Sequence, residues 1–219
     1  VGSNEANMDA SSKSIIAYGS IKLKDNTYFE SAVALGEMEI DLARSVDGGQ
    51  NKGVRDGKQI YGSFTYLFEP EEEYIIEDRS LNYYTRLDLG YTMLDDYTES
   101  GDDTSVVYND QSVKNATLSI GFNYSSLIEL DKGIITPLIK FEMGTSKTIN
   151  SLSEAYYIND ASTIYANAIA NQSTAHGQLT LGLGASLENN LNLNISFDHY
   201  RNDKETFVNS FTINVRKLF

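Results

Sequence analysis

Apolar residues at every second position, repeated along the whole chain, constrain the fold more than any other feature of this sequence. In the run LNYYTRLDLGYTM, Leu81, Leu87 and Met93 share one face of an extended strand, whereas Arg86 and Asp88 share the other. Nine such runs lie at residues 15–23, 29–35, 60–68, 81–93, 116–124, 135–143, 179–187, 191–197 and 210–219. A period of two predicts strands rather than helices, so we expect an all-β, antiparallel protein.

Two classes of all-β protein share this alternation: a soluble sandwich with one face in its core, and a membrane barrel with one face in lipid. The longer runs exceed the roughly 5–6 residues typical of globular strands and suit the ~9–11 tilted residues that cross a bilayer. A mean hydropathy of −0.34 does not argue against a barrel, because its strands alternate lipid-facing and water-facing residues. The 15 Tyr and 9 Phe also suit membrane–water boundaries.

The connections between the runs alternate in length. Residues 25–27, 130–133 and 188–190 predict tight turns, and the polar stretches 44–57, 95–112 and 147–177 predict long loops. This asymmetry is typical of outer-membrane barrels, whose short turns are periplasmic and whose long loops are extracellular. The C-terminus is then periplasmic, with residues 1–12 outside the cell. Two connections fit this alternation less well. Residues 69–80 form a long connection where a short turn is expected, and residues 203–205 form a short one where a long loop is expected.

Nine strands are an odd number for a complete single-chain barrel. Either strands are missing upstream, or residues 151–174 hide another strand. The chain begins VGSNEANMDASS, without an initiator Met or a signal segment, so we interpret it as a mature product or fragment.

Four stretches, in this order and spacing, resemble the translocator β-barrel domain of autotransporters, the type V secretion proteins. They are YGSIKLKDNTYFESAVALGEMEIDLAR, YYTRLDLGYTMLDDYTESG, GIITPLIKFEMG and LTLGLGASLENNLNLNISFDHY. The resemblance covers essentially all of residues 1–219 as one domain. It implies a twelve-stranded transmembrane up-and-down barrel of which about nine strands are present, without the first three strands, the helix inside the pore and the exported passenger.

The last strand, SFTINVRKLF, puts Phe211, Ile213, Val215 and Phe219 on one face. The resemblance implies that this aromatic-ended strand is the signal read by the outer-membrane assembly machinery. The family usually has an apolar residue at the third position from the end, where this chain has Lys217. The partners implied are lipid and lipopolysaccharide of the outer membrane, the assembly machinery with its periplasmic chaperones, and the chain's own N-terminal passenger.

Several charged residues fall on the face opposite the apolar one, and we expect them to line the lumen. An Arg or Lys that faced the lipid midplane would cost roughly 2–4 kcal/mol. They form either a solvated pore wall or the path of a linker or exported segment. The candidates are Lys22, Arg86, Asp88, Lys140, Glu142, Asp198 and Arg216.

Other chemistry finds little support. The net charge of −14 excludes nucleic acid as a partner, and no Cys and two His leave out thiol nucleophiles and His-rich zinc sites. Asp198 and His199 are adjacent in one strand and point to opposite faces, so no catalytic pair is expected and no cofactor is implied. The acidic stretch 95–103 lacks EF-hand spacing and is interpreted as a solvated loop.

The sequence therefore predicts an outer-membrane barrel that anchors a passenger and helps to export it. Two alternatives stay open: a general outer-membrane barrel, such as a small porin or adhesin, and a soluble all-β binding module.

Overall fold

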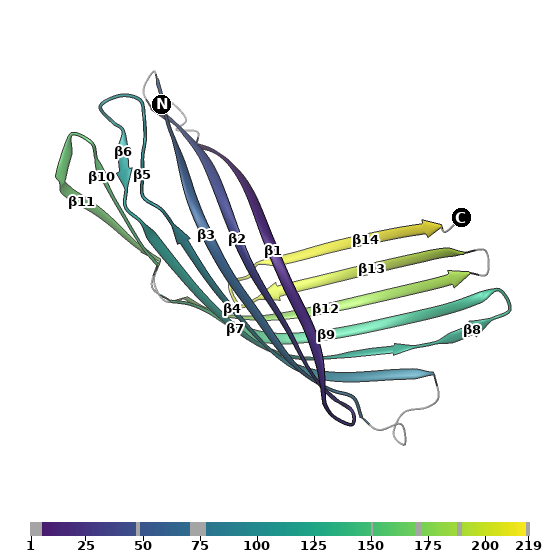
Figure 1. Cartoon of the computed structure of the whole chain (residues 1–219). Helices are drawn as coiled ribbons and strands as arrows, with labels where there is room; N and C mark the ends of the chain where they lie inside the picture. The colour runs from purple at the N-terminus through teal and green to yellow at the C-terminus, as the bar shows by residue number, and fades with distance from the viewer. Residues whose placement is uncertain are drawn as a thin grey trace.

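Nine strands follow one another in chain order through one antiparallel sheet (Figure 1). The structure is a computed structural model that describes residues 6–46, 49–70, 78–149, 151–169, 172–187 and 190–217. The strands of this main sheet are β1 (Ala6–Lys24), β2 (Thr27–Val46), β3 (Gly49–Phe68), β4 (Arg79–Leu94), β7 (Gln111–Ser126), β9 (Gly133–Ile149), β12 (Gln172–Leu187), β13 (Leu191–Asn202) and β14 (Phe207–Lys217). The predicted all-β, up-and-down architecture is confirmed.

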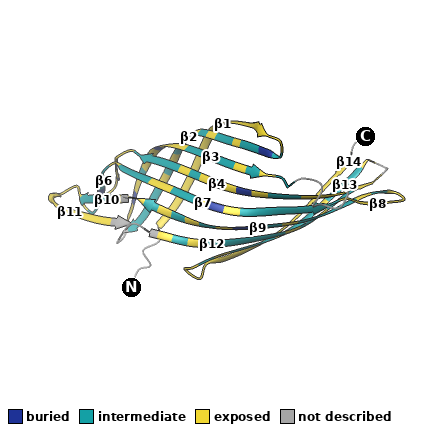
Figure 2. Cartoon of the chain, turned by 90° about the horizontal axis from the view of Figure 1, so that it is seen from below, coloured by how far each residue is buried: buried dark blue, intermediate teal, exposed yellow. Residues whose placement is uncertain are grey.

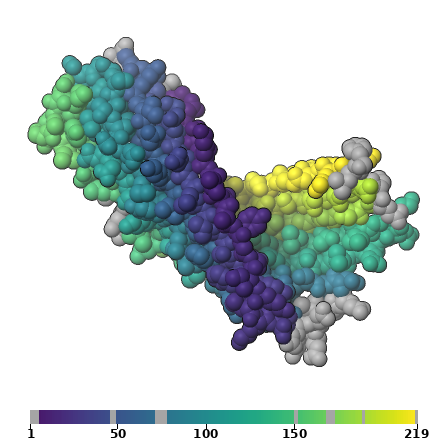
Figure 3. Space-filling model, in the orientation of Figure 1, coloured from purple at the N-terminus to yellow at the C-terminus, as the bar shows by residue number. Residues whose placement is uncertain are grey.

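The main sheet is curved and open. Strands β1 and β14 are its two edges, and each pairs with a single neighbour among the described residues. Figure 2 shows that the middle strands are partly covered whereas β1 is exposed along its length. In Figure 3, β1 crosses the front of the molecule and the C-terminal strands form a separate arm beside it. In the described residues no helix is long and apolar enough to cross a membrane.

A second, four-stranded sheet lies at the end of the main sheet that holds the start of β1 (Figure 1). Its order is β11-β10-β6-β5, with bounds β5 (Tyr97–Thr98), β6 (Val106–Tyr108), β10 (Ser151–Tyr157) and β11 (Asp160–Ile169). Residues 151–174 thus do contain further strands, but β10 pairs with β11 and with β6 instead of entering the main sheet. We call this the loop sheet.

The prediction of a long loop at residues 44–57 is wrong. Strand β2 continues to Val46 and β3 begins at Gly49, and the ladder is unbroken from Gly36 opposite Gln59 to Arg44 opposite Asn51. Strand β9 likewise continues to Ile149, and β12 begins at Gln172. The alternation was missed in β2 because its phase changes at Gly36: Val33 and Leu35 lie on one face, whereas Ile40 and Leu42 lie on the other.

The short connections follow the prediction where the structure describes them. A two-residue turn at Asp25 and Asn26 joins β1 to β2, with Asn26 at φ 63°, a conformation that Asn tolerates better than most residues. β8 (Ile128–Leu130) pairs with β9 across the turn at 131–132. The connection after β13 is also short, at 203–206. In the predicted connection 69–80, residues 71–77 lie outside the described residues, as do 188 and 189 in the turn 188–190.

Register separates the main sheet into an apolar and a polar face. On the polar face Asp88 pairs with Ser63 and Thr117, and on the apolar face Leu87 pairs with Phe64 and Leu118. Polar side chains of β4 reach those of β9 across β7, so the sheet is concave on its polar side. On the convex side Leu35, Ile60 and Leu89 are 58%, 44% and 43% exposed. Such a sheet encloses a wet lumen and presents its hydrophobic face outward.

Candidate functional site: the polar wall and the loop-end network

The middle of the concave face carries a connected cluster of charged and hydroxyl side chains, which we call the wall cluster (Tyr61, Ser63, Tyr84, Arg86, Asp88 and Glu142). Asp88 accepts hydrogen bonds from Tyr61 Oη at 2.7 Å and Ser63 Oγ at 2.6 Å, both on β3. Arg86 Nε donates to Asp88 Oδ2 at 2.9 Å. One carboxylate is thus satisfied by three donors from two neighbouring strands.

Glu142 on β9 is the deepest member of the wall cluster, with 3% of its surface exposed. Tyr84 Oη donates to its Oε2 at 2.6 Å and Arg86 Nη2 donates to its Oε1 at 2.7 Å. His176 Nε2 on β12 lies 3.9 Å from the same Oε1. Arg86 therefore bridges two carboxylates, which neutralises charge along the wall without leaving the guanidinium unpaired.

Small residues of β7 make this contact between non-adjacent strands possible. Gly121 stands between Tyr84 and Glu142 in the register, and Ser119 is the partner of Arg86. A Cβ at Gly121 would lie 2.6 Å from the Cζ of Tyr84, so the tyrosine ring crosses the sheet directly over this glycine. The missed residues Tyr61, Ser63 and Tyr84 are ordinary strand residues in the sequence, and the Ser-Ile-Gly of β7 is the signal that could have pointed to them.

The structure brings four of the seven predicted lumen residues together. Arg86, Asp88 and Glu142 belong to the wall cluster, and Lys140 Nζ lies 5.5 Å from the centroid of the Tyr84 ring. The other three lie elsewhere. In the register all seven lie on the polar face. Their partners on neighbouring strands are Tyr28 for Lys22, Ser119 for Arg86, Ser63 for Asp88, Asn123 for Lys140, Gly121 for Glu142, Thr180 for Asp198 and Asn192 for Arg216.

The three separate residues make local contacts. Asp198 accepts a hydrogen bond from Thr180 Oγ1 at 2.6 Å, and His199 lies on the opposite face, where its Nδ1 is 2.7 Å from Asn209 Oδ1. Lys22 forms an exposed ion pair with Asp25 at 3.4 Å beside the first turn. Arg216 lines a groove with polar residues of β12 and β13.

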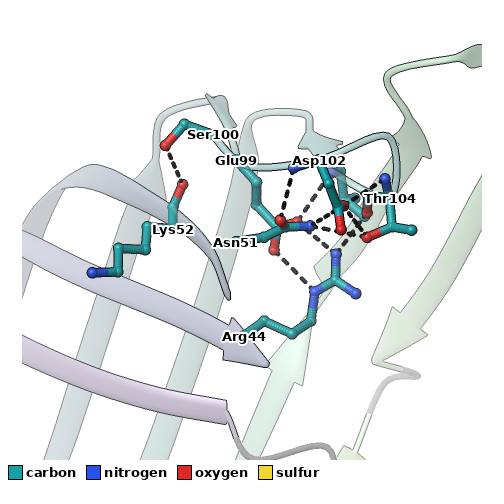
Figure 4. A network of polar contacts seen from close by, with 8 residues as sticks. Arg44, Asn51, Lys52, Glu99, Ser100, Asp102 and Thr104 are labelled. Atoms are coloured by element: carbon teal, nitrogen blue, oxygen red, sulfur yellow. Dashed lines mark hydrogen bonds and ion pairs between the residues drawn. The ribbon is translucent and has the colours of Figure 1, made fainter. Parts of the chain in front are cut away.

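A second polar network joins the far end of the β2–β3 hairpin to the segment that follows β4 (Figure 4). Arg44 Nη2 donates to Glu99 Oε2 at 2.6 Å, and the same oxygen accepts from the backbone N of Val106 at 3.0 Å. Asn51 Nδ2 donates to Asp102 Oδ1 at 3.3 Å and to Thr104 Oγ1 at 3.1 Å. Glu99 is 5% exposed, so the acidic stretch 95–103 is not simply a solvated loop.

We call the contacts among Arg44, Asn51, Glu99, Asp102 and Thr104 the loop-end network. Its electrostatics follow from its hydrogen bonds. The bond to Glu99 raises the pKa of Arg44, and bonds from the Thr104 side chain and backbone lower the pKa of the Asp102 carboxyl. Arg55 holds the same segment at both ends, since its Nε donates to Asp95 O at 2.8 Å and its Nη2 to Asn109 O at 2.9 Å. Burial lowers the pKa of Arg55.

The predicted assembly strand lies at the edge of the main sheet. Phe211, Ile213 and Val215 are 65%, 55% and 66% exposed on the apolar face of β14. Phe219 lies outside the described residues. The described part of the chain has no group of three His, Cys, Asp or Glu that could hold a metal ion.

An antiparallel sheet with a hydrophobic convex face and a polar concave face defines the class of membrane β-barrels. The family model for the autotransporter β-domain matches residues 1–198. The chain belongs to the autotransporter β-domain family, and it is an outer-membrane barrel that exports a passenger domain.

One solved structure shows the same fold, and two others with lower TM-scores are similar over most of the chain. The translocator domain of the autotransporter NalP from Neisseria meningitidis superposes with a TM-score of 0.64 at 17% identity, over 98% of this chain and 69% of that one. The β-domain of the Bordetella autotransporter BrkA gives 0.36 at 12% identity, over 98% and 92%. The transport unit of AIDA-I from Escherichia coli gives 0.37 at 9%, over 99% and 86%. No curated protein sequence matches this chain.

Proposed function

We propose that the concave face lines the route of the passenger, with the wall cluster as its most constrained part. The observation that carries this is the pairing of charges inside the sheet: Arg86 sits between Asp88 and Glu142, all three on the concave face. A wall whose charges are already satisfied stays hydrated without holding a passing chain by strong ion pairs. The role is a conduit and anchor, with no catalytic step.

Residues 1–219 act as one domain whose barrel is closed by further strands between β1 and β14. Both edge strands support this, because all described positions of each are exposed, with Ile15 at 81% and Phe211 at 65%. In lipid, unpaired backbone groups along an edge cost several kcal/mol each, so a membrane sheet has to close. Three upstream strands would complete the twelve implied by the family resemblance.

The long connections and the loop sheet face the cell exterior, and the short turns with the C-terminus face the periplasm. The length asymmetry of the connections supports this orientation. The exposed apolar row on β14 is the surface offered to the outer-membrane assembly machinery after delivery by periplasmic chaperones. Lipid, including lipopolysaccharide, covers the convex face of the folded barrel.

Single-cysteine variants test the route, because the chain contains no Cys. In the full-length protein, Ser196→Cys places a thiol on the concave face and Phe197→Cys places the matched thiol on the convex face one residue away. A cysteine in a stalled passenger is expected to cross-link to position 196 and not to 197. Cross-linking at position 197 alone, or equal cross-linking at both, would overturn the proposed route.

Two further cysteine variants test the orientation in intact cells. Asp103→Cys lies next to the loop-end network, and Asp131→Cys lies in the short turn between β8 and β9. A membrane-impermeant maleimide is expected to label position 103 in intact cells and position 131 only after the outer membrane is permeabilised. The reverse pattern would invert the proposed orientation while leaving the fold intact.

A further inference from the structure

Basic side chains lie on the convex face, each toward the end of its strand that is proposed to face the cell exterior. They belong to five different strands and are all exposed. We call these residues the basic collar: Lys13 on β1, Lys58 on β3, Lys114 on β7, Lys147 on β9 and Arg201 on β13.

Register places each collar residue on the convex face. Lys13 pairs with Glu37, which pairs with Lys58, so these three side chains form one row across β1, β2 and β3. Lys114 pairs with Tyr91, and its Nζ lies 5.4 Å from the centroid of that ring. None of the five collar residues makes an ion pair with another residue in the described part of the chain. Five cations face a single carboxylate, that of Glu37, in the same rows.

Lys13 and Lys58 share one row, with apolar residues on one side of it and acidic residues on the other. Toward the short turns, the next residue of the same face is Ile15 after Lys13 and Ile60 after Lys58. In the opposite direction, Asp56 follows Lys58 and Asp203 follows Arg201. These two cations thus stand between an apolar and an acidic row in a chain whose net charge is −14. A basic row directly above an apolar surface matches the phosphate plane of a lipid leaflet.

A groove of about 510 Å³ lies at the best-defined part of the collar. Lys13 and Lys58 stand on either side of Glu37 at its upper end, and Ile15, Leu35, Ile60 and Met93 line it below. Lys13 and Lys58 are two strands apart, or about 10 Å from the usual strand spacing. A ligand for this groove needs two separated anionic groups and attached hydrocarbon chains.

We propose that this groove binds the lipid A part of lipopolysaccharide, with its two phosphates at Lys13 and Lys58 and an acyl chain along Ile15, Leu35 and Ile60. The proposal rests on the outer-membrane location and deepens the proposed contact with lipopolysaccharide. Charge complementarity selects a doubly phosphorylated glycolipid, because a phospholipid with one phosphate satisfies only one side of the groove. Lys114, Lys147 and Arg201 provide further exposed cations on the same face.

The test titrates the folded full-length protein in micelles with lipid A and counts bound lipids by native mass spectrometry. Wild type is expected to bind bisphosphorylated lipid A more tightly than the monophosphorylated form, and phosphatidylglycerol least. The double variant Lys13→Gln/Lys58→Gln is expected to lose on the order of 25-fold in affinity, at about fivefold for each lysine near an anionic surface. Lys13→Arg/Lys58→Arg is expected to keep the affinity of wild type.

Lys24→Gln/Lys132→Gln is the matched control, since it removes the same charge at the short-turn end of the sheet. An equal loss in this control, or wild-type binding that does not depend on phosphate number, overturns the proposal, as does phosphatidylglycerol binding as tightly as lipid A. A heat-dependent gel shift shows separately whether each variant folds as a barrel, so a failed barrel is distinguished from a failed lipid site. If the glutamine variant does not fold, the phosphate series on wild type decides.

Discussion

The two halves of the β2–β3 hairpin belong to one unbroken ladder, but the face that carries the apolar side chains is reversed between them. In the half near the first turn, Val33 and Leu35 are exposed on the convex face. In the far half, Glu37 and Glu39 take that face, and Ile40 and Leu42 turn to the concave side toward the loop sheet. Packing there is close, because a Cβ at Gly53 would lie 2.6 Å from the Tyr97 ring. In the proposed membrane placement, the change at Gly36 marks where lipid outside gives way to water outside and protein inside.

The largest expected effect comes from placing a charge on the convex face at the level of each half; Leu87 on β4 represents the near half, because it pairs with Phe64 of β3. Leu87→Arg puts a guanidinium in the apolar middle of β4 and is expected to destabilise the folded barrel by about 2–4 kcal/mol. Val54→Arg is the matched change in the far half, where Asp41 is its cross-strand neighbour, and it is expected to change stability by less than about 0.5 kcal/mol. Urea unfolding in lipid vesicles measures both, and equal effects would remove the assigned boundary at Gly36.

The next prediction removes one charge from the wall cluster and so tests the concave face. Glu142→Gln weakens the bonds from Tyr84 and Arg86 in a site that is 3% exposed, so the expected loss is about 1.5–3 kcal/mol of unfolding free energy. Tyr84→Phe removes a single hydrogen bond and is expected to cost about 1 kcal/mol. The same urea transitions report both values. A Glu142→Gln barrel as stable as wild type would show that the wall cluster contributes little to the fold.

The sequence alone predicts the strand segments near the short turns better than those near the loop sheet, and the reason is physical. In residues 81–93 one face meets lipid along the whole strand, so the alternation keeps one phase and reveals strand, face and class together. In β2 the surroundings of the strand change at Gly36, and the apolar residues move there from odd to even positions. The strand beyond Gly36 therefore resembles a polar loop in the sequence. Arg44, Asn51 and Arg55 were therefore missed.

The wall cluster was predicted in part for a related reason. Strand alternation alone places Arg86, Asp88 and Glu142 on the face opposite the apolar one, because charged side chains are unfavourable in lipid. That Arg86 and Glu142 meet across β7 depends on the curvature of the sheet and on the lack of a side chain at Gly121. Neither is a property of a single strand, so single-strand alternation does not reveal the contact.

The loop-end network provides a smaller and more local test. Glu99→Gln breaks a charged contact that joins Arg44 of the hairpin to Val106 of the loop sheet. Because the network lies beyond the membrane part, the expected result is a several-fold faster protease cleavage within residues 95–112, with the heat-dependent gel shift of the barrel unchanged. Arg44→Gln should give the same pattern from the partner side. Cleavage at the wild-type rate in both variants would show that the two sheets are held together by other contacts.

The smallest expected effect is a pH dependence at Asp102. Bonds from Thr104 Oγ1 and from the Thr104 backbone N lower the pKa of this carboxyl below its ordinary value of about 3.9. A lowered pKa stabilises the folded loop above pH ~4, and this contribution is lost as the pH falls through the lowered pKa. Exchange of the Thr104 amide hydrogen should therefore be slower in wild type than in Asp102→Asn at pH 6, and the difference should shrink as the pH falls below about 4. Since Asp102 is exposed to solvent, the difference should be small and confined to this turn; a difference that persisted unchanged at pH 2 would place its origin outside the carboxylate.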